Sequence, residues 1–506
     1  MKRDISFVLA WTFQCASEDR ASRAQVRLDA RSITGLIANI TILCATIYYS
    51  DSPCRWRSLI GIFTCFTVAI LISENLFSIN FGVINRAFLV YQIISYCFVH
   101  VSSFQHQILR FAFVLIGSSN ARFTGFNTLF GNVSKSYLID ISISLIVQGA
   151  FVNLFYHLGI MQIVISSVGN IISFLIGTSP IESFIATTHI FFGIAESSIA
   201  IKPFIAFLTP SELTMMMTSS FASTALTLWS SLIAIQIPPY DILRASVSTL
   251  PCSIVFAKIL YPEIFKTRAT RQMIKCSRHG HSNNISAFEA FLKGAVSSLS
   301  ICATLFVCIL VINTTLYWLD DIISNMFILI NLENISFQIL LSYTFYPFAY
   351  AMGVPKRDLQ EVSRLIGIKT IFSEAIAFQK LSKIIILREN LPPQNINRYI
   401  CGIEEFVNPE MKHMIFHKRS LAIVISALTG FANMNSLSSM IGVLSAIAPK
   451  RMSTVRKQIG KSLCCAAMVN IMNGIMAGLY SASDDEKLDC LSIANMTTIE
   501  MDKILM

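Results

Sequence analysis

The segment Gly430-Phe431-Ala432-Asn433-Met434-Asn435-Ser436 interrupts an apolar stretch that runs from residue 419 to residue 447. A second apolar stretch, near residues 213 to 236, is interrupted by the similar segment Ser220-Phe221-Ala222-Ser223-Thr224-Ala225. Both interruptions share a Phe-Ala-polar core. Serine, asparagine and glycine favour caps and turns over the helix interior, so each stretch is predicted to be a helix that breaks in its middle.

Each interrupted stretch follows a segment of mixed polarity. Residues 177 to 213 and residues 353 to 380 are too polar to lie in lipid and too apolar to be loops. Non-helical backbone at membrane depth persists only where protein or a water-filled cavity satisfies its polar groups. We therefore predict two re-entrant hairpins, in which ionisable residues such as Glu196, Lys369 and Glu374 are candidates for function. An amphipathic helix on the membrane surface is the alternative interpretation.

The order of hairpin, broken helix and complete helix occurs twice, with the complete helices near residues 240 to 261 and 458 to 481. The number of crossings between the two copies places them on opposite sides of the membrane, which predicts an inverted repeat. Such repeats hold a substrate near the midplane, where the ends of half-helices direct their dipoles at substrate and ion. The alternative is that the Phe-Ala-polar core shared by the two segments arose by chance.

Composition indicates a membrane environment for the whole chain. Hydrophobic residues make up 54% of the 506 residues and charged residues only 13%, which is outside the range of ordinary soluble domains. A bilayer span requires about 20 mostly apolar residues. Such stretches lie near residues 33–50, 57–78, 84–117, 138–178, 213–236, 240–261, 293–319, 335–353, 419–447 and 458–481. We therefore expect about eight or more crossings, with the orientation of the first 130 residues left open.

The formal net charge of +10 comes mainly from Lys and Arg in the loops between apolar stretches. The strongest basic cluster lies in residues 261–284, and a second lies in residues 450–461. Because cytoplasmic loops of membrane proteins are enriched in Lys and Arg, both clusters are predicted to face the cytoplasm, and nucleic-acid binding is not expected. The acidic residues after position 481 then lie outside, together with the glycosylation sequons at Asn334 and Asn495.

Several motifs between residues 155 and 480 resemble the concentrative nucleoside transporter family. Its first hairpin is similar to Gly177-Thr178-Ser179-Pro180-Ile181-Glu182-Ser183 and to Phe192-Gly193-Ile194-Ala195-Glu196. Its second hairpin is similar to Leu365-Ile366-Gly367-Ile368-Lys369-Thr370 with Ser373-Glu374, and its second broken helix is similar to Gly430-Phe431-Ala432-Asn433. Several long motifs in the family's order make the resemblance specific.

The resemblance implies an all-α polytopic membrane protein with inverted repeats, two re-entrant hairpins and two broken transmembrane helices. It divides the chain into N-terminal scaffold helices (1–137), a nucleoside transporter core (138–480) and an acidic extracytoplasmic tail (481–506). It also implies a homotrimer in the lipid of the plasma membrane that takes up nucleosides, driven by a cation gradient and without another cofactor. An enzyme is not expected, because the sequence contains no convergent catalytic cluster.

The resemblance also places the substrate site. It implies that Ile194, Ala195 and Glu196 lie on the nucleobase side of the substrate, with Leu228 as a further contact. Glu374, Asn433 and Ser436 are implied to bind the ribose hydroxyls. Phe431 is implied to pack on the substrate. A carboxylate accepts from two sugar hydroxyls at once, and an amide both donates and accepts. For Glu374 the alternative is a structural pair with Lys369. For Asn433 and Ser436 it is a hydrogen bond between membrane helices.

Two departures from the family concern the nucleobase and the ion. Ile194 and Ala195 replace a glutamine and a hydroxyl residue, so base selectivity is expected to be loose or shifted. The family's sodium ligands correspond by resemblance to His189, Phe192, Ser223 and Thr224. A neutral imidazole is a poor ligand for a hard cation, whereas its unperturbed pKa of about 6.5 lies near physiological pH. Weak sodium dependence, with the proton as an alternative coupling ion and stronger uptake at acidic pH, is therefore expected.

A transport-inactive, nucleoside-binding membrane sensor or receptor is the second functional hypothesis. A seven-helix receptor would lack the paired hairpins and the repeated helix break. Uptake of labelled nucleoside by cells that express the chain, with and without sodium, separates the two hypotheses.

Overall fold

The computed structural model of the chain describes residues 53–101, 157–224, 235–265, 286–329, 336–391 and 417–480, with isolated positions in 39–43, 107–155, 229–233 and 396–415. Every regular element within these residues is a helix, which confirms the predicted all-α class. The basic loop at residues 266–285 and the acidic tail after residue 480 lie outside the described residues. The topology predicted from them therefore stays a prediction.

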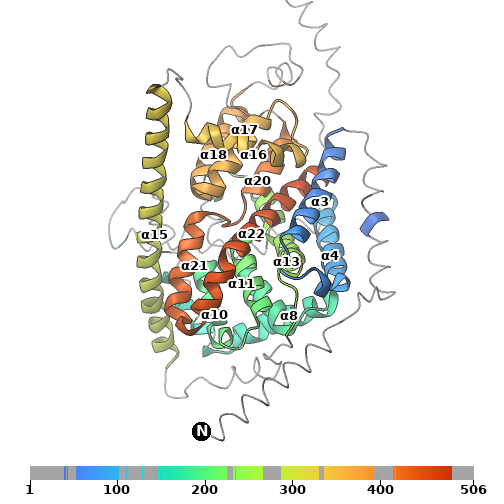
Figure 1. Cartoon of the computed structure of the whole chain (residues 1–506). Coiled ribbons are helices and arrows are strands. Elements are labelled where there is room, and N and C mark those ends of the chain that lie inside the picture. Colours follow the sequence, from blue (N-terminus) through green and yellow to red (C-terminus); the bar gives the residue numbers. More distant parts are fainter. Residues whose placement is uncertain are drawn as a thin grey trace, which may run out of the picture.

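The first half of the chain contains α3 and α4, the first hairpin and the first broken helix (Figure 1). Its elements are α3 (Pro53–Leu71), η1 (Leu76–Ser78), α4 (Phe81–His100), α8 (Ile160–Ile176), α9 (Pro180–Phe191), α10 (Ile194–Ile205), α11 (Pro210–Ala222) and α13 (Pro239–Leu260).

The second half begins with a long helix and ends with another, and the second hairpin and second broken helix lie between them (Figure 1). Its elements are α15 (Ala287–Leu329), α16 (Phe337–Ala351), α17 (Leu359–Ile371), α18 (Glu374–Glu389), α20 (Lys418–Leu428), α21 (Met434–Ile447), η3 (Pro449–Arg451) and α22 (Met452–Tyr480).

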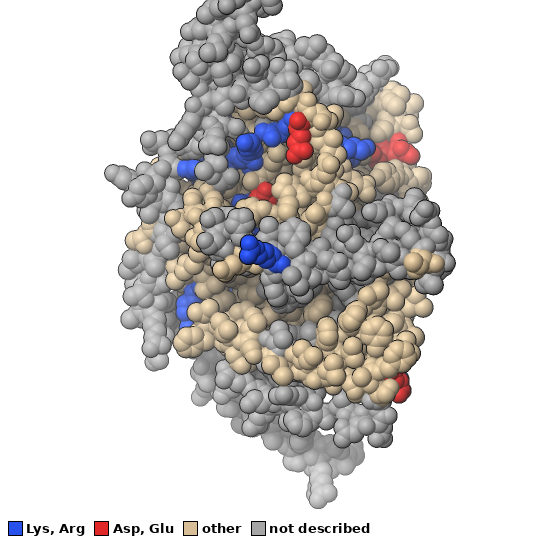
Figure 2. Space-filling view, turned by 180° about the vertical axis from the view of Figure 1, so that it is seen from behind, with Lys and Arg blue, Asp and Glu red and all other residues tan. Residues whose placement is uncertain are grey.

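Several described helices are long and apolar enough to cross a membrane. Four qualify singly, namely Cys54–Leu71, Phe81–His100, Pro239–Leu260 and Pro449–Tyr480. A fifth span is formed if Ser167–Ile176 and Pro180–His189, which are bent by 116° to one another, are counted together. These helices and the mostly uncharged described surface in Figure 2 agree with a multi-pass membrane protein.

Two predicted spans differ from the helices of the structure. The expected span at 138–178 is wrong in extent, because Gly159, with a φ of 76°, separates α8 from the helical positions before it. The expected span at 293–319 is too short, because α15 continues for 43 residues through Asp320 and Asp321. At 1.5 Å per residue α15 is about 65 Å long, roughly twice the hydrocarbon thickness of a bilayer. Charged residues limit an apolar stretch, but they do not end a helix.

Both predicted hairpins are present as pairs of short helices that pack against each other. α9 and α10 meet at Phe192 and Gly193, and α17 and α18 meet at Phe372 and Ser373. α9 begins with a capping box, in which Ser179 Oγ accepts from the backbone N of Glu182 and the Glu182 carboxylate accepts from the backbone N of Ser179. The Pro at its first position also favours a helix start there.

Both predicted helix breaks are present, and they touch. α11 ends at Ala222 and is followed by extended backbone at Ser223. α20 ends at Leu428, and α21 begins at Met434, directly after its N-cap Asn433. Gly430 has a φ of 112°, a conformation that favours glycine. A Cβ at Gly430 would lie 2.2 Å from the carbonyl oxygen of Ala222. The two interrupted segments therefore cross at Ala222 and Gly430, where only a glycine permits this approach.

α22 is the central support of this crossing. It packs against α20, α11, α13 and α3, and it runs diagonally through the molecule in Figure 1. α15 lies at the edge of the described bundle and contacts α21 and α16 (Figure 1). α22 therefore supports both broken helices where they cross at Ala222 and Gly430.

Candidate substrate and ion site

Glu374, Asn433 and Ser436, predicted to bind the ribose, form one hydrogen-bonded group. Asn433 Nδ2 donates to Oε2 of Glu374. Asn433 Oδ1 accepts from the backbone N of Ser436 at 2.9 Å and from Ser436 Oγ at 3.0 Å. All three side chains are buried. The structure thus brings together a carboxylate, an amide and a hydroxyl from the second hairpin and the second broken helix.

The ends of two helices position this group. Ser373 is the N-cap of α18, so Glu374 is the first residue of that helix, and Asn433 is the N-cap of α21. Helix N-termini carry partial positive charge and exposed backbone N–H groups, which stabilise a carboxylate between them. A carboxylate accepts about four hydrogen bonds, so the bond from Asn433 is compatible with further bonds from sugar hydroxyls.

The remaining substrate residues are only partly described. Ile194 is the first residue of α10 and is buried, and α10 packs against α21, the helix that carries Ser436. Phe431 is half-buried within the second helix break. The side chains of Ala195 and Glu196, and all of Leu228, lie outside the described residues, so their roles remain predictions.

The four residues predicted to hold an ion lie on α9 and α11 or directly after them. His189 is in the last turn of α9 and Phe192 is its C-cap, while Ser223 is the C-cap of α11 and Thr224 follows it. The imidazole Nδ1 of His189 lies 2.9 Å from Ser219 Oγ in α11. α9 and α11 pack together, so the predicted positions share one helix contact.

The donor set at this contact fits a hard cation. Thr224 Oγ1 and Ser220 Oγ are buried and have no hydrogen-bond partner among the described residues, and the same holds for His189 Nε2. Buried polar atoms normally have partners, so these atoms are available to a further ligand. Hydroxyls and the carbonyls at helix C-termini are oxygen ligands of the kind that hard cations prefer. Groups of three or more His, Cys, Asp and Glu, which suit transition metals, are not found in the described part of the chain.

Sequence reasoning missed the residue that joins the two helix breaks, which is Asn470 of α22. In the amide orientation that satisfies its neighbours, its nitrogen donates to Thr429 O and Ala222 O, both at 3.0 Å, and its oxygen accepts from Lys369 Nζ at 2.6 Å. Asn470 is buried. A polar residue inside an otherwise apolar span is the available signal for such a role.

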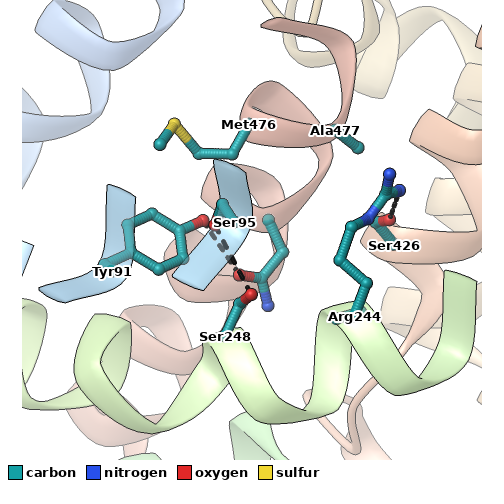
Figure 3. Close-up of a pocket in the computed structure, with 9 residues that line it drawn as sticks. Tyr91, Ser95, Arg244, Ser248, Ser426, Met476 and Ala477 are labelled. Atoms are coloured by element: carbon teal, nitrogen blue, oxygen red, sulfur yellow. Dashed lines mark hydrogen bonds between the residues drawn. The ribbon is translucent and has the colours of Figure 1, made fainter. Parts of the chain in front are cut away.

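A second polar cluster links α4, α13, α20 and α22 beside a small cavity (Figure 3). Tyr91 OH donates to Asn473 Oδ1 at 2.9 Å, and Asn473 Nδ2 donates to Thr249 Oγ1 at 2.8 Å. On the other side of the cavity, Arg244 donates to Ser426 Oγ at 2.7 Å (Figure 3). These bonds join helices within the bundle.

Comparison with known proteins identifies the family. The family model described as "Na+ dependent nucleoside transporter C-terminus" matches residues 241–478. Human Solute carrier family 28 member 3 is 33% identical over 364 residues, which cover 71% of this chain and 50% of that protein. The chain belongs to the concentrative nucleoside transporter family.

Other members of the concentrative nucleoside transporter family agree with this assignment. Sodium/nucleoside cotransporter 1 from Homo sapiens is 30% identical over 353 residues, covering 68% of this chain and 51% of that protein. The chain thus spans about half the length of the curated relatives it matches. These relatives are named as a solute carrier and a cotransporter, in agreement with the expectation that the chain is not an enzyme.

Solved structures share the fold of this chain. The structure of CNTnw in an inward-facing substrate-bound state matches with a TM-score of 0.69 at 23% identity, covering 86% of this chain and 99% of that one. A CNTnw variant in an outward-facing state matches with a TM-score of 0.70 at 23% identity, covering 84% and 98%. The fold implied by the sequence motifs is therefore confirmed.

Proposed function

We propose that this chain is a cation-coupled secondary transporter that moves nucleosides across the membrane by alternating access. The observation that carries the proposal is the bond between Glu374 and Asn433, which gathers acceptors and donors where two half-helices begin. A ribose presents adjacent hydroxyls, which such a carboxylate and amide bind together. Relatives named as nucleoside cotransporters support the substrate class.

On the nucleobase side, Ile194 is proposed to contact the base, together with Ala195, Glu196 and Leu228. The buried isoleucine offers van der Waals contact and no hydrogen bond. An apolar contact discriminates poorly between bases that differ in polar groups. Loose or shifted base selectivity is therefore part of the proposal, with Phe431 packing on the substrate from the second helix break.

Sodium is the proposed coupling ion, at the contact between α9 and α11. Relatives named sodium/nucleoside cotransporters and the buried Thr224 hydroxyl without a described partner support it. When bound, the ion would supply positive charge at the C-terminal ends of these helices, where carbonyls carry partial negative charge. Ser223, Thr224 and the carbonyl of Phe192 would hold it, and His189 in place of an amide predicts weak affinity. Proton coupling is the alternative.

Assembly and location follow from family membership as further proposals. The homotrimer, the plasma membrane and the surrounding lipid are assigned to this chain by resemblance. The long helix α15, whose exposed side chains include Phe306, Leu310 and Trp318, offers an apolar face for lipid or for a second copy.

The test of the proposed function is uptake of labelled uridine and adenosine by transport-deficient cells that express the chain. We expect saturable uptake that is larger in sodium chloride than in choline chloride. Surface labelling confirms that the protein reaches the plasma membrane. Absence of uptake at normal surface expression contradicts transport, and nucleoside binding by the purified chain in that case supports the sensor hypothesis.

A further inference from the structure

His189 and Lys369 occupy equivalent positions in the two hairpins. Each lies three residues before the phenylalanine that caps the first helix of its hairpin, Phe192 in one case and Phe372 in the other. Both side chains are buried, at 1% and 2% exposure. His189 reaches Ser219 in the last turn of α11, and Lys369 reaches the last turn of α20. Each side chain therefore approaches the C-terminal end of the first half of a broken helix.

The position in the second hairpin is filled by a positive charge from the chain itself. Lys369 Nζ donates to the carbonyl oxygen of Ala427 at 3.4 Å, one residue before the end of α20. It also donates to the oxygen of Asn470 at 2.6 Å, and the nitrogen of that amide holds the carbonyls of Ala222 and Thr429. Helix C-termini carry partial negative charge, so an ammonium group is stabilised at this point.

The position in the first hairpin lacks such a charge. His189 Nε2 and Thr224 Oγ1 are buried without a hydrogen-bond partner among the described residues. Lys369, in contrast, has two acceptors, and it also interacts electrostatically with Glu374. The two halves of the site thus share a helix-end geometry and differ in whether the chain supplies the cation.

We infer that the Lys369 ammonium group is a tethered cation, which takes at the second broken helix the place that an exchangeable sodium ion takes at the first. Only the first position then exchanges its cation with solvent, so one sodium ion binds per chain. The identity of the exchangeable ion rests on the proposed function.

The inference predicts that a small oxygen-bearing residue at position 369 opens a second sodium site. Lys369→Asn removes the ammonium and shortens the side chain, so that space for an ion opens between its amide oxygen, the carbonyl of Ala427 and the oxygen of Asn470. Lys369→Arg keeps the positive charge and is the matched control. Lys369→Met fills the volume without charge or ligand. The readout is the melting temperature of the purified, detergent-solubilised protein as sodium chloride replaces choline chloride at constant ionic strength, which requires no transport.

Each bound sodium ion stabilises the folded protein by a free energy that grows with the logarithm of the sodium concentration. The slope of melting temperature against the logarithm of sodium concentration therefore increases with the number of sodium sites. We expect Lys369→Asn to increase this slope about twofold over the wild type, Lys369→Arg to leave it unchanged, and Lys369→Met to lower the melting temperature without changing the slope. An unchanged slope in Lys369→Asn overturns the inference. Failure of Lys369→Asn to fold at any sodium concentration, while Lys369→Arg folds, also overturns it, because a free ion then cannot replace the ammonium. A wild type without sodium response contradicts the proposed ion site, whereas a sodium response gained by Lys369→Asn still supports the tethered cation.

Discussion

Asn433 donates a hydrogen bond to the carboxylate of Glu374, although 59 residues separate them in the chain. The bond joins the N-cap of α21 to the first residue of α18. It couples the second hairpin to the second broken helix at the point proposed to bind ribose. A movement that separates these two helix ends would dismantle the ribose site, so substrate binding and the position of the hairpin are linked.

Glu374→Gln is expected to lower nucleoside uptake at least about 10-fold while leaving surface expression near normal. The amide retains a possible bond with Asn433, but it loses the charge-assisted bonds to sugar hydroxyls, each worth about 1.5–3 kcal/mol. Initial rates of uridine uptake measure the effect. Glu361→Gln, which changes another buried carboxylate of the same hairpin, is the control and should transport normally. Near-normal uptake by Glu374→Gln would contradict the assignment of Glu374 to the ribose site.

Ser436→Ala is expected to raise the KM for nucleoside several-fold. Ser436 Oγ bonds to Asn433 Oδ1 at 3.0 Å, and its loss removes a hydroxyl from the proposed ribose group and loosens the asparagine. Ser439→Ala is the control, because Ser439 Oγ is also buried on α21 but bonds to the carbonyl of Asn435 in its own helix. Equal effects of the two variants would indicate that Ser436 only stabilises the helix.

The sequence predicted the parts of this fold that leave a local pattern. Gly430 and Asn433 predicted the second break because a left-handed glycine and an N-cap asparagine have characteristic preferences. The hairpins were predicted because their polar residues cannot face lipid. Each of these features lies within one continuous stretch of the chain.

The contacts that join distant segments could not be predicted in this way. Lys369, Asn470 and the carbonyl of Ala222 meet only in the folded chain, and no spacing in the sequence reports a backbone carbonyl as a ligand. Ser219, the partner of His189, was missed for the same reason. The full length of α15 was missed because hydropathy marks the apolar part of a helix and not its ends.

Ile194→Gln is expected to sharpen base selectivity. Ile194 begins α10 directly after Gly193 and is buried, and an amide there offers a donor and an acceptor to the base. A panel of purine and pyrimidine nucleosides competing with labelled uridine measures the inhibition constants. We expect their spread to widen about 10-fold or more in the variant. Ile194→Leu is the control, and sharp selectivity in the wild type would contradict the role of Ile194.

Asn473→Leu is expected to lower the stability of the bundle without changing the substrate site. The variant removes both bonds of Asn473, to Tyr91 OH and Thr249 Oγ1. A buried hydroxyl left without a partner costs about 1–3 kcal/mol, although the measured worth of such bonds in membranes averages about 0.6 kcal/mol. The melting temperature in detergent should fall by a few degrees, and the double variant with Tyr91→Phe should recover part of the loss. Unchanged stability would show that the cluster in Figure 3 contributes little.

His189→Asn is expected to strengthen sodium activation of uptake. In the wild type the imidazole is buried against Ser219 at 2.9 Å, and its other ring nitrogen has no described partner. Nitrogen is a poor ligand for a hard cation, whereas an amide oxygen is a good one. The half-saturating sodium concentration should therefore fall about 10-fold in the variant, about 1.4 kcal/mol in binding free energy. Sodium titrations of uridine uptake at pH 7.5, with choline as the replacement cation, measure it.

His157→Asn, which alters a histidine outside the proposed ion site, is the control. A steep sodium dependence in the wild type that His189→Asn leaves unchanged would mean that the histidine is structural. Uptake without sodium that grows between pH 8 and pH 5.5, and that is lost in His189→Asn, would instead favour the proton as the coupling ion.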